Sequence, residues 1–125
     1  MLSRRGLLLF HLRRSALQRQ LHSDLLLSPR VAKARRESRP IVALESTVIT
    51  HGLPFPTNLE TAQLLERAVR EGGAEPATIA LLDGKIRVGL SEEELEAVAK
   101  EGNAVKVSRR DIAHALVTAE QPWQP

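Results

Sequence analysis

The 125-residue chain contains no cysteine, and this absence excludes disulfide frameworks, cysteine-ligated zinc sites and thiolate nucleophiles. Aromatic residues make up only 2% of it, too few for a surface on which nucleic-acid bases stack. No apolar run approaches the roughly 18 residues that a membrane-spanning helix needs. We therefore expect a small core of aliphatic side chains and no membrane span.

Charge is divided unevenly along the chain. Residues 1–39 hold ten Lys and Arg against two acids, a net charge of +8, whereas residues 40–125 hold eight against thirteen, a net charge of −5. Recognition of nucleic acid needs a basic patch on the folded surface. Because the positive charge is confined to the first third of the chain, nucleic acid is not an expected partner.

The first third has the composition of a leader. No acid occurs before Asp24, and arginines alternate with leucines and serines, which is typical of a mitochondrial transit peptide. We predict a basic leader over residues 1–39 and a mitochondrial location. The alternative is a disordered basic extension of a cytoplasmic protein, which the continuing run of basic residues to Arg36 also suits.

From Pro40 onward the apolar pattern predicts alternating strands and helices. The expected elements are a buried strand (41–44), a helix (from 57 to Gly72-Gly73), a hairpin (77–82 and 85–88), a helix (from 91 to Gly102), a strand (104–107) and a last helix (to about 119). Asp83-Gly84 is a strong hairpin turn signal. This order predicts an α/β fold in which helices cover a sheet.

Three helix starts have the spacing of a capping box, in which a Ser or Thr and an acid three residues later satisfy free N–H groups. They lie at 57–60, 91–94 and 108–111. The buried stripe of the first helix is expected at Ala62, Leu65 and Val69, and that of the second at Leu95, Val98 and Ala99.

Glu45 directly follows the first apolar strand. The carboxyl ends of strands in open α/β sheets are where ligand crevices form, and burial there would raise the pKa of this carboxyl group toward the range of a general acid. The alternative is an exposed acid that caps the following loop. His51 stands without a second metal-ligating residue at suitable spacing, so we expect it to be structural.

A second candidate cluster holds Lys106, Arg109 and Arg110. A lysine at a strand end, just before a helix whose N–H groups attract anions, suits a phosphate site. The alternative is that the two arginines pair on the surface with Asp111 or with the acids at 92–94, at little energetic gain.

Four blocks of sequence, in order, resemble the indigoidine synthase A-like family, whose members include pseudouridine-5′-phosphate glycosidase. They are Val42 to Pro56, Gly73 to Ala80, Val88 to Ser91 and Lys106 to Asp111. The resemblance runs from about Pro40 to Val117. It implies an α/β/α sandwich with a mixed sheet, in a homotrimer that uses Mn²⁺.

The resemblance also implies a reaction. Pseudouridine 5′-phosphate and water are converted reversibly into uracil and ribose 5-phosphate. The bond broken is C–C, so there is no leaving oxygen to protonate and the usual mechanism with two carboxylates is insufficient. The family opens the ribose with a glutamate as proton donor and a lysine that forms a Schiff base. Glu45 corresponds to the proton donor and Lys106 to a substrate-binding lysine, with Arg109 and Arg110 as weaker additions.

Other parts of the family pattern do not match this sequence. The aspartate that binds Mn²⁺ and the Schiff-base lysine have no counterpart here, and Lys33, Lys85 and Lys100 lie outside any matching motif. We therefore expect residues 40–125 to be a partial domain with a divergent tail from about residue 118, truncated to its amino-terminal part. We expect it to bind no Mn²⁺ and to be inactive alone; association with full-length subunits is the alternative role.

Overall fold

The structure, a computed structural model, describes residues 25–118. Its centre is a four-stranded mixed sheet with the order β1-β4-β3-β2. β2 (Ile41–Glu45) runs parallel to β3 (Glu75–Leu82), β3 is antiparallel to β4 (Lys85–Val88), and β4 is parallel to β1 (Leu25–Leu27). The α/β fold with a mixed sheet is confirmed.

The hairpin forms as predicted. Asp83 and Gly84 have φ values of 50° and 67°, and positive φ at both central residues matches the twist of the flanking strands. The chain then enters α4 (Glu92–Lys100) through a complete capping box between Ser91 and Glu94. The predicted stripe of Leu95, Val98 and Ala99 is buried.

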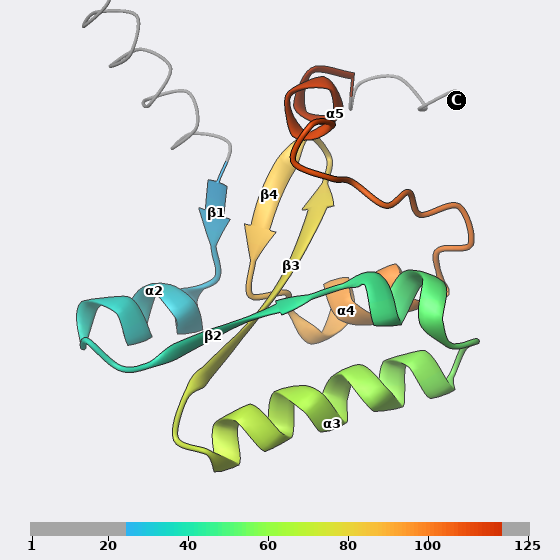
Figure 1. Cartoon of the computed structure of the whole chain (residues 1–125). Helices are drawn as coiled ribbons and strands as arrows, with labels where there is room; N and C mark the ends of the chain where they lie inside the picture. Colours follow the sequence, from blue (N-terminus) through green and yellow to red (C-terminus); the bar gives the residue numbers. More distant parts are fainter. Residues whose placement is uncertain (1–24, 119–125) are drawn as a thin grey trace, which may run out of the picture.

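One face of the sheet is covered by three helical segments, α3 (Thr57–Glu71), α4 and the short π-helix η1 (Val48–Gly52). Figure 1 shows α3 running below β2, with α4 behind it. The core lies between them and includes Ile49, Ala62 and Leu90, together with Ala80 and Leu82 of β3. Alternate residues of a strand share one face, so β3 presents this side to the helices.

Two expectations about α3 are wrong. Its N-cap is Pro56 and no side chain caps it, because the chain already turns over 54–56 and the carbonyl groups of Pro54 and Pro56 accept the first free N–H groups. Of its predicted stripe Ala62 is buried and Val69 half-buried, but Leu65 is 42% exposed, and Asn58 and Glu66 are buried in its place. Polar residues occupy the inner face because each finds hydrogen-bond partners there.

Residues 25–39, assigned to the leader from their charge, are part of the fold. β1 pairs with β4, and α2 (Pro29–Arg36) begins at the N-cap Ser28 and buries Val31 and Ala34. Three of the four basic residues of α2, Lys33, Arg35 and Arg36, lie in its last turn, where positive charge is favourable. The boundary at Pro40 is therefore wrong, while the rest of the predicted leader lies outside the described residues.

The strand expected over 104–107 does not form. These residues have no regular structure, and Val105 and Val107 are exposed. A strand needs a neighbour for its backbone hydrogen bonds, and in the described part of the chain none lies beside this segment. The segment leads into α5 (Ile112–Thr118), which Figure 1 shows near the end of the described chain. The predicted last helix is therefore confirmed up to residue 118.

Candidate functional site

Glu45 is the last residue of β2 and stands beside Ile79 of β3. The two strands are parallel, so their carboxyl ends meet at the same end of the sheet, as predicted for a ligand crevice. β2 is however an edge strand, and Glu45 is exposed. We expected this carboxyl group to be buried, but residues 25–118 leave it exposed.

The segment after Glu45 forms η1, which anchors it to the core. Ile49 is 2% exposed and belongs to the core, and the Thr50 hydroxyl donates to the carbonyl of Ser46 over 3.2 Å. His51 is exposed, and its Nδ1 lies 2.7 Å from the Thr50 hydroxyl. This contact is local, and the structural role expected for His51 stays a prediction.

Asn58 is a structural residue that the sequence interpretation missed. Its side chain is 3% exposed, and its amide nitrogen donates to the carbonyls of Ile49, over 2.8 Å, and Ala99, over 2.7 Å. Its oxygen accepts the N–H of Leu59. One amide therefore joins α3, η1 and the end of α4 behind the strand that carries Glu45. The capping-box pattern at 57–60 drew attention to Thr57 instead.

Lys106, Arg109 and Arg110 lie on the exposed segment between α4 and α5. The arginines do not pair as the alternative expected, because Asp111 binds Ser108, while Glu93 and Glu94 bind Ser91 and Arg87. The Asp111 carboxylate accepts the N–H of Ser108 over 2.8 Å and its hydroxyl group. These two hydrogen bonds lower the pKa of Asp111, the bond from the Ser108 hydroxyl more than the bond from its N–H. The Asp111 carboxylate thus already accepts from donors just before α5, where the sequence predicted a phosphate site.

The described residues do not fit a manganese site. Nowhere among residues 25–118 do three or more His, Asp or Glu side chains gather closely enough to hold a metal ion. The same range contains no helix that is long and apolar enough to cross a membrane.

Fold and site together define an α/β protein with a carboxylate at the carboxyl end of an edge strand. The model of the indigoidine synthase A-like protein family matches residues 30–122, a range that includes all of α2 except Pro29 and extends beyond both limits given by the motifs. The chain therefore belongs to the indigoidine synthase A-like family.

Curated relatives are named pseudouridine-5′-phosphate glycosidase. The protein from Cupriavidus pinatubonensis is 57% identical over 98 residues, and that from Rhodospirillum centenum is 60% identical over 96 residues. These alignments cover 78% and 77% of this chain but 31% and 30% of the relatives. The chain thus spans about a third of the length of the relatives it matches.

Two solved structures share the fold. The prealnumycin C-glycosynthase AlnA, in complex with ribulose 5-phosphate, is 44% identical with a TM-score of 0.66 and aligns with 76% of this chain and 30% of its own. An indigoidine synthase A-like protein from Thermotoga maritima is 42% identical with a TM-score of 0.59, over 65% of this chain and 27% of its own.

Proposed function

We propose that this chain carries the proton-donor part of a pseudouridine-5′-phosphate glycosidase, which cleaves the C–C glycosidic bond to give uracil and ribose 5-phosphate. The observation that carries the proposal is Glu45 at the carboxyl end of β2, next to a parallel β3, in a chain more than half identical to curated glycosidases. A C-glycosynthase with a bound ketose phosphate shares the fold, which supports a phosphorylated sugar as the ligand class.

In this proposal Glu45 donates the proton that opens the ribose ring, and Lys106 holds the substrate near its 5′-phosphate, with Arg109 and Arg110 adding positive charge. Both arginines and Lys106 are exposed, so they can reach an anion from outside. Mn²⁺ in the family would supply charge stabilisation to the opened sugar. None of the described residues is assigned to it.

We propose further that these 125 residues alone do not release uracil. Covalent catalysis needs an amine nucleophile, and no lysine of the chain matches the family's Schiff-base motif. Purified protein incubated with pseudouridine 5′-phosphate and Mn²⁺ should give no uracil by chromatography. Uracil release that Glu45→Gln abolishes would contradict this part of the proposal.

A chimera tests the roles of the residues. Residues 30–117 of this chain replace the aligned segment of the Cupriavidus pinatubonensis protein, and the product should be trimeric and active. Glu45→Gln should then abolish turnover while the chimera still binds ribose 5-phosphate, and Lys106→Gln should mainly raise KM. Full activity of the Glu45→Gln chimera would refute the proton-donor role.

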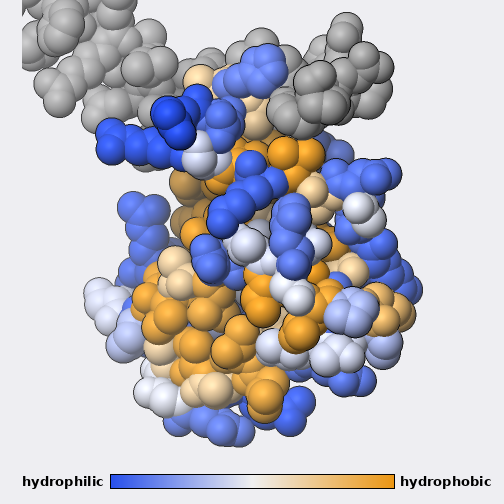
Figure 2. Space-filling view, turned by 45° about the vertical axis from the view of Figure 1, so that its right-hand side comes forward, coloured by the Kyte–Doolittle hydropathy of each residue, from blue (hydrophilic) through white to orange (hydrophobic). Residues whose placement is uncertain are grey.

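A second candidate function is a non-catalytic partner of full-length subunits. The supporting observation is the edge of β2, where Ile41 is 37% and Val42 is 39% exposed. A free strand edge is a template for pairing with another chain. Figure 2 shows further apolar side chains at the surface. Among residues 25–118, the large exposed ones outside β2 are Leu25, Leu26, Leu53, Phe55, Leu64, Leu65, Val105 and Val107.

Co-expression with a full-length family enzyme separates the two functions. A regulatory chain should co-purify with the enzyme and lower its activity, and Val42→Lys, which places a charge on the edge strand, should prevent both effects. Enzyme that purifies alone and at full activity would rule out the regulatory role.

The mitochondrial location remains part of the proposal. Residues 1–24 precede β1 and have the composition of a transit peptide, so a fluorescent protein fused to them should enter mitochondria. Residues 25–39 fused in the same way are the matched control, because they are also basic but belong to the fold. Diffuse signal from the first fusion would reject import.

A further inference from the structure

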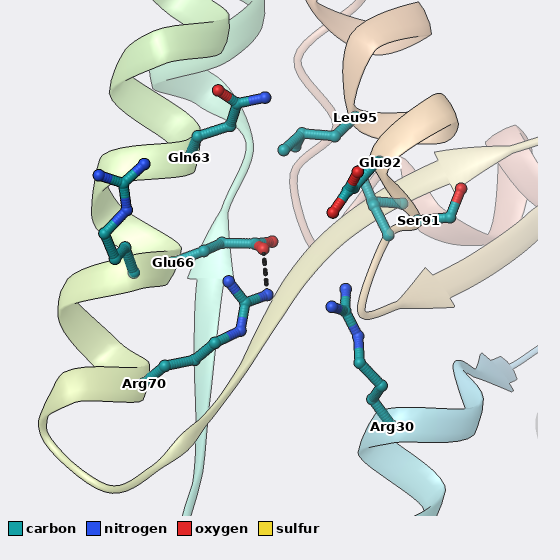
Figure 3. A pocket seen from close by; sticks show the side chains of 9 residues that line it. Arg30, Gln63, Glu66, Arg70, Ser91, Glu92 and Leu95 are labelled. Carbon is teal, nitrogen blue, oxygen red and sulfur yellow. Dashed lines mark hydrogen bonds and ion pairs between the residues drawn. The ribbon is translucent and has the colours of Figure 1, made fainter.

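A cavity of about 210 Å³ lies between α2, α3 and the start of α4. Figure 3 shows Arg30 reaching in from α2 and Arg70 from α3, with Ser91 and Glu92 on the same side as Arg30, across from α3. The full lining is Arg30, Gln63, Glu66, Arg67, Arg70, Leu90, Ser91, Glu92 and Leu95. Three arginines and two acids line it, which gives the lining a net charge of +1.

Arg70 has donors to spare. It uses one nitrogen on Glu66, over 2.8 Å, whereas a guanidinium group has five N–H donors in a planar fork. Glu66 is fixed in turn, because it is 6% exposed and its other oxygen accepts the Thr78 hydroxyl over 2.7 Å. Arg70 is therefore held in place by an acid whose charge it already balances.

Arg30 is less committed. Its only described acidic neighbour is Glu75, whose Oε1 lies 3.9 Å from the Arg30 Nε, beyond hydrogen-bonding distance. Its side chain is 49% exposed and can approach a ligand in the cavity. Ser91 and Glu92, at the amino end of α4, also line the cavity. The N–H groups of Ser91 and Glu94 are already bound in the capping box, so the positive charge of the cavity comes from its arginines.

We propose that this cavity binds a small oxyanion, the phosphate group of inorganic phosphate or of a phosphomonoester, between the forks of Arg30 and Arg70. Planar guanidinium groups bind phosphate through paired N–H donors. The site is separate from Glu45, because Arg30 lies beside Glu75, which pairs with Ile41 at the other end of β2.

Titration of the whole chain with inorganic phosphate at constant ionic strength, followed by ¹H–¹⁵N NMR, tests the site. Saturable shifts are expected at Arg30, Arg70 and Ser91. Arg30→Gln should weaken binding by about tenfold or more, since a charged hydrogen bond is lost and a tenfold change in Kd corresponds to only about 1.4 kcal/mol. Glu92→Gln should strengthen binding, because it removes the one acid of the lining that has no guanidinium partner.

The controls separate this site from others. Arg36→Gln removes the same charge from α2 outside the cavity and should leave the affinity unchanged, and circular dichroism confirms that each variant is folded. Lys106→Gln should also leave the affinity of the cavity for phosphate unchanged. The cavity is thereby tested separately from the role proposed for Lys106, which is measured in the chimera. Ribose 5-phosphate should bind the cavity like inorganic phosphate if only the phosphate group is recognised.

Three results would overturn the proposal. They are the absence of saturable shifts, equal affinities of the folded Arg30→Gln and Arg36→Gln variants, and shifts that disappear with Lys106→Gln. If Glu92→Gln weakened binding instead of strengthening it, the anion would not lie at the start of α4.

Discussion

Replacing Asn58 by Ala should destabilise the protein strongly, because two buried carbonyl groups depend on its amide. Ala99 lies in the last turn of α4, where carbonyl groups have no partner within the helix. The carbonyl of Ile49 would bond to residue 54 in a π-helix, but residue 54 is a proline and has no N–H. Asn58 satisfies both.

Each carbonyl left without a partner costs about 1–3 kcal/mol, so Asn58→Ala should lower the free energy of unfolding by about 2–5 kcal/mol. That is a large share of the roughly 5–15 kcal/mol that stabilises a typical domain. With a urea slope of about 1–3 kcal/mol per M, the midpoint should fall by about 1 M or more, as measured by circular dichroism at 222 nm.

Two further variants make the Asn58 result decisive. Asn103→Ala changes the same residue type at an exposed position and should shift stability by less than about 0.5 kcal/mol. Asn58→Asp keeps the shape but turns a carboxylate toward two carbonyl oxygens, so it should be at least as unstable as Asn58→Ala at neutral pH and recover partly in acid. A midpoint for Asn58→Ala equal to that of Asn103→Ala would refute the reasoning.

Three other predictions concern packing, pH and the sheet. Gly89→Ala should cost about 2–4 kcal/mol, because a Cβ would lie 2.5 Å from the Ser28 hydroxyl oxygen at a φ of +86°; Gly73→Ala, at a φ of +85° with nothing within 4 Å, should cost measurably less. The lowered pKa of Asp111 means that its bonds to Ser108 stabilise the fold above its unfolded pKa and are lost as pH falls through the folded value; the protection factors of amides at the start of α5, which are corrected for the intrinsic exchange rate, should therefore fall in acid, and Asp111→Asn should remove this dependence. Amides of β3, between two strands, should exchange more slowly than those of the edge strand β2, and equal rates would show that the sheet does not persist.

Local signals in the sequence predicted much of the fold correctly. The Asp83-Gly84 turn and the capping box of α4 depend on residues within four positions of each other, so spacing alone identifies them. The errors arose where distant residues decide. Leu65 is exposed and Glu66 is buried because the hydroxyl of Thr78, on another element, donates a hydrogen bond to the Glu66 carboxylate.

The first helix and strand were missed for a similar reason. A basic, leucine-rich segment has the same composition whether it is a leader or a surface helix, and the sequence contains no sign that β1 pairs with β4. The close approach of Gly89 to Ser28 shows that α2 and the hairpin are fitted to each other. Glycine in the Val88 to Ser91 block was the available signal, but its partner could not be identified from sequence.

For the candidate site, the described residues set the position of Glu45 but not its surroundings. The position of Glu45 is set by the described residues, since β3 holds its strand and Asn58 fixes the segment that follows. Its environment is not, because β2 has a neighbour on one side only. A carboxylic acid works as a proton donor in a site that excludes water, and nothing among residues 25–118 covers Glu45. The chain spans about a third of its curated relatives, so we expect the remaining part of such a protein to cover Glu45, and the chimera, in which that part is restored, is the assembly where proton donation by Glu45 should appear.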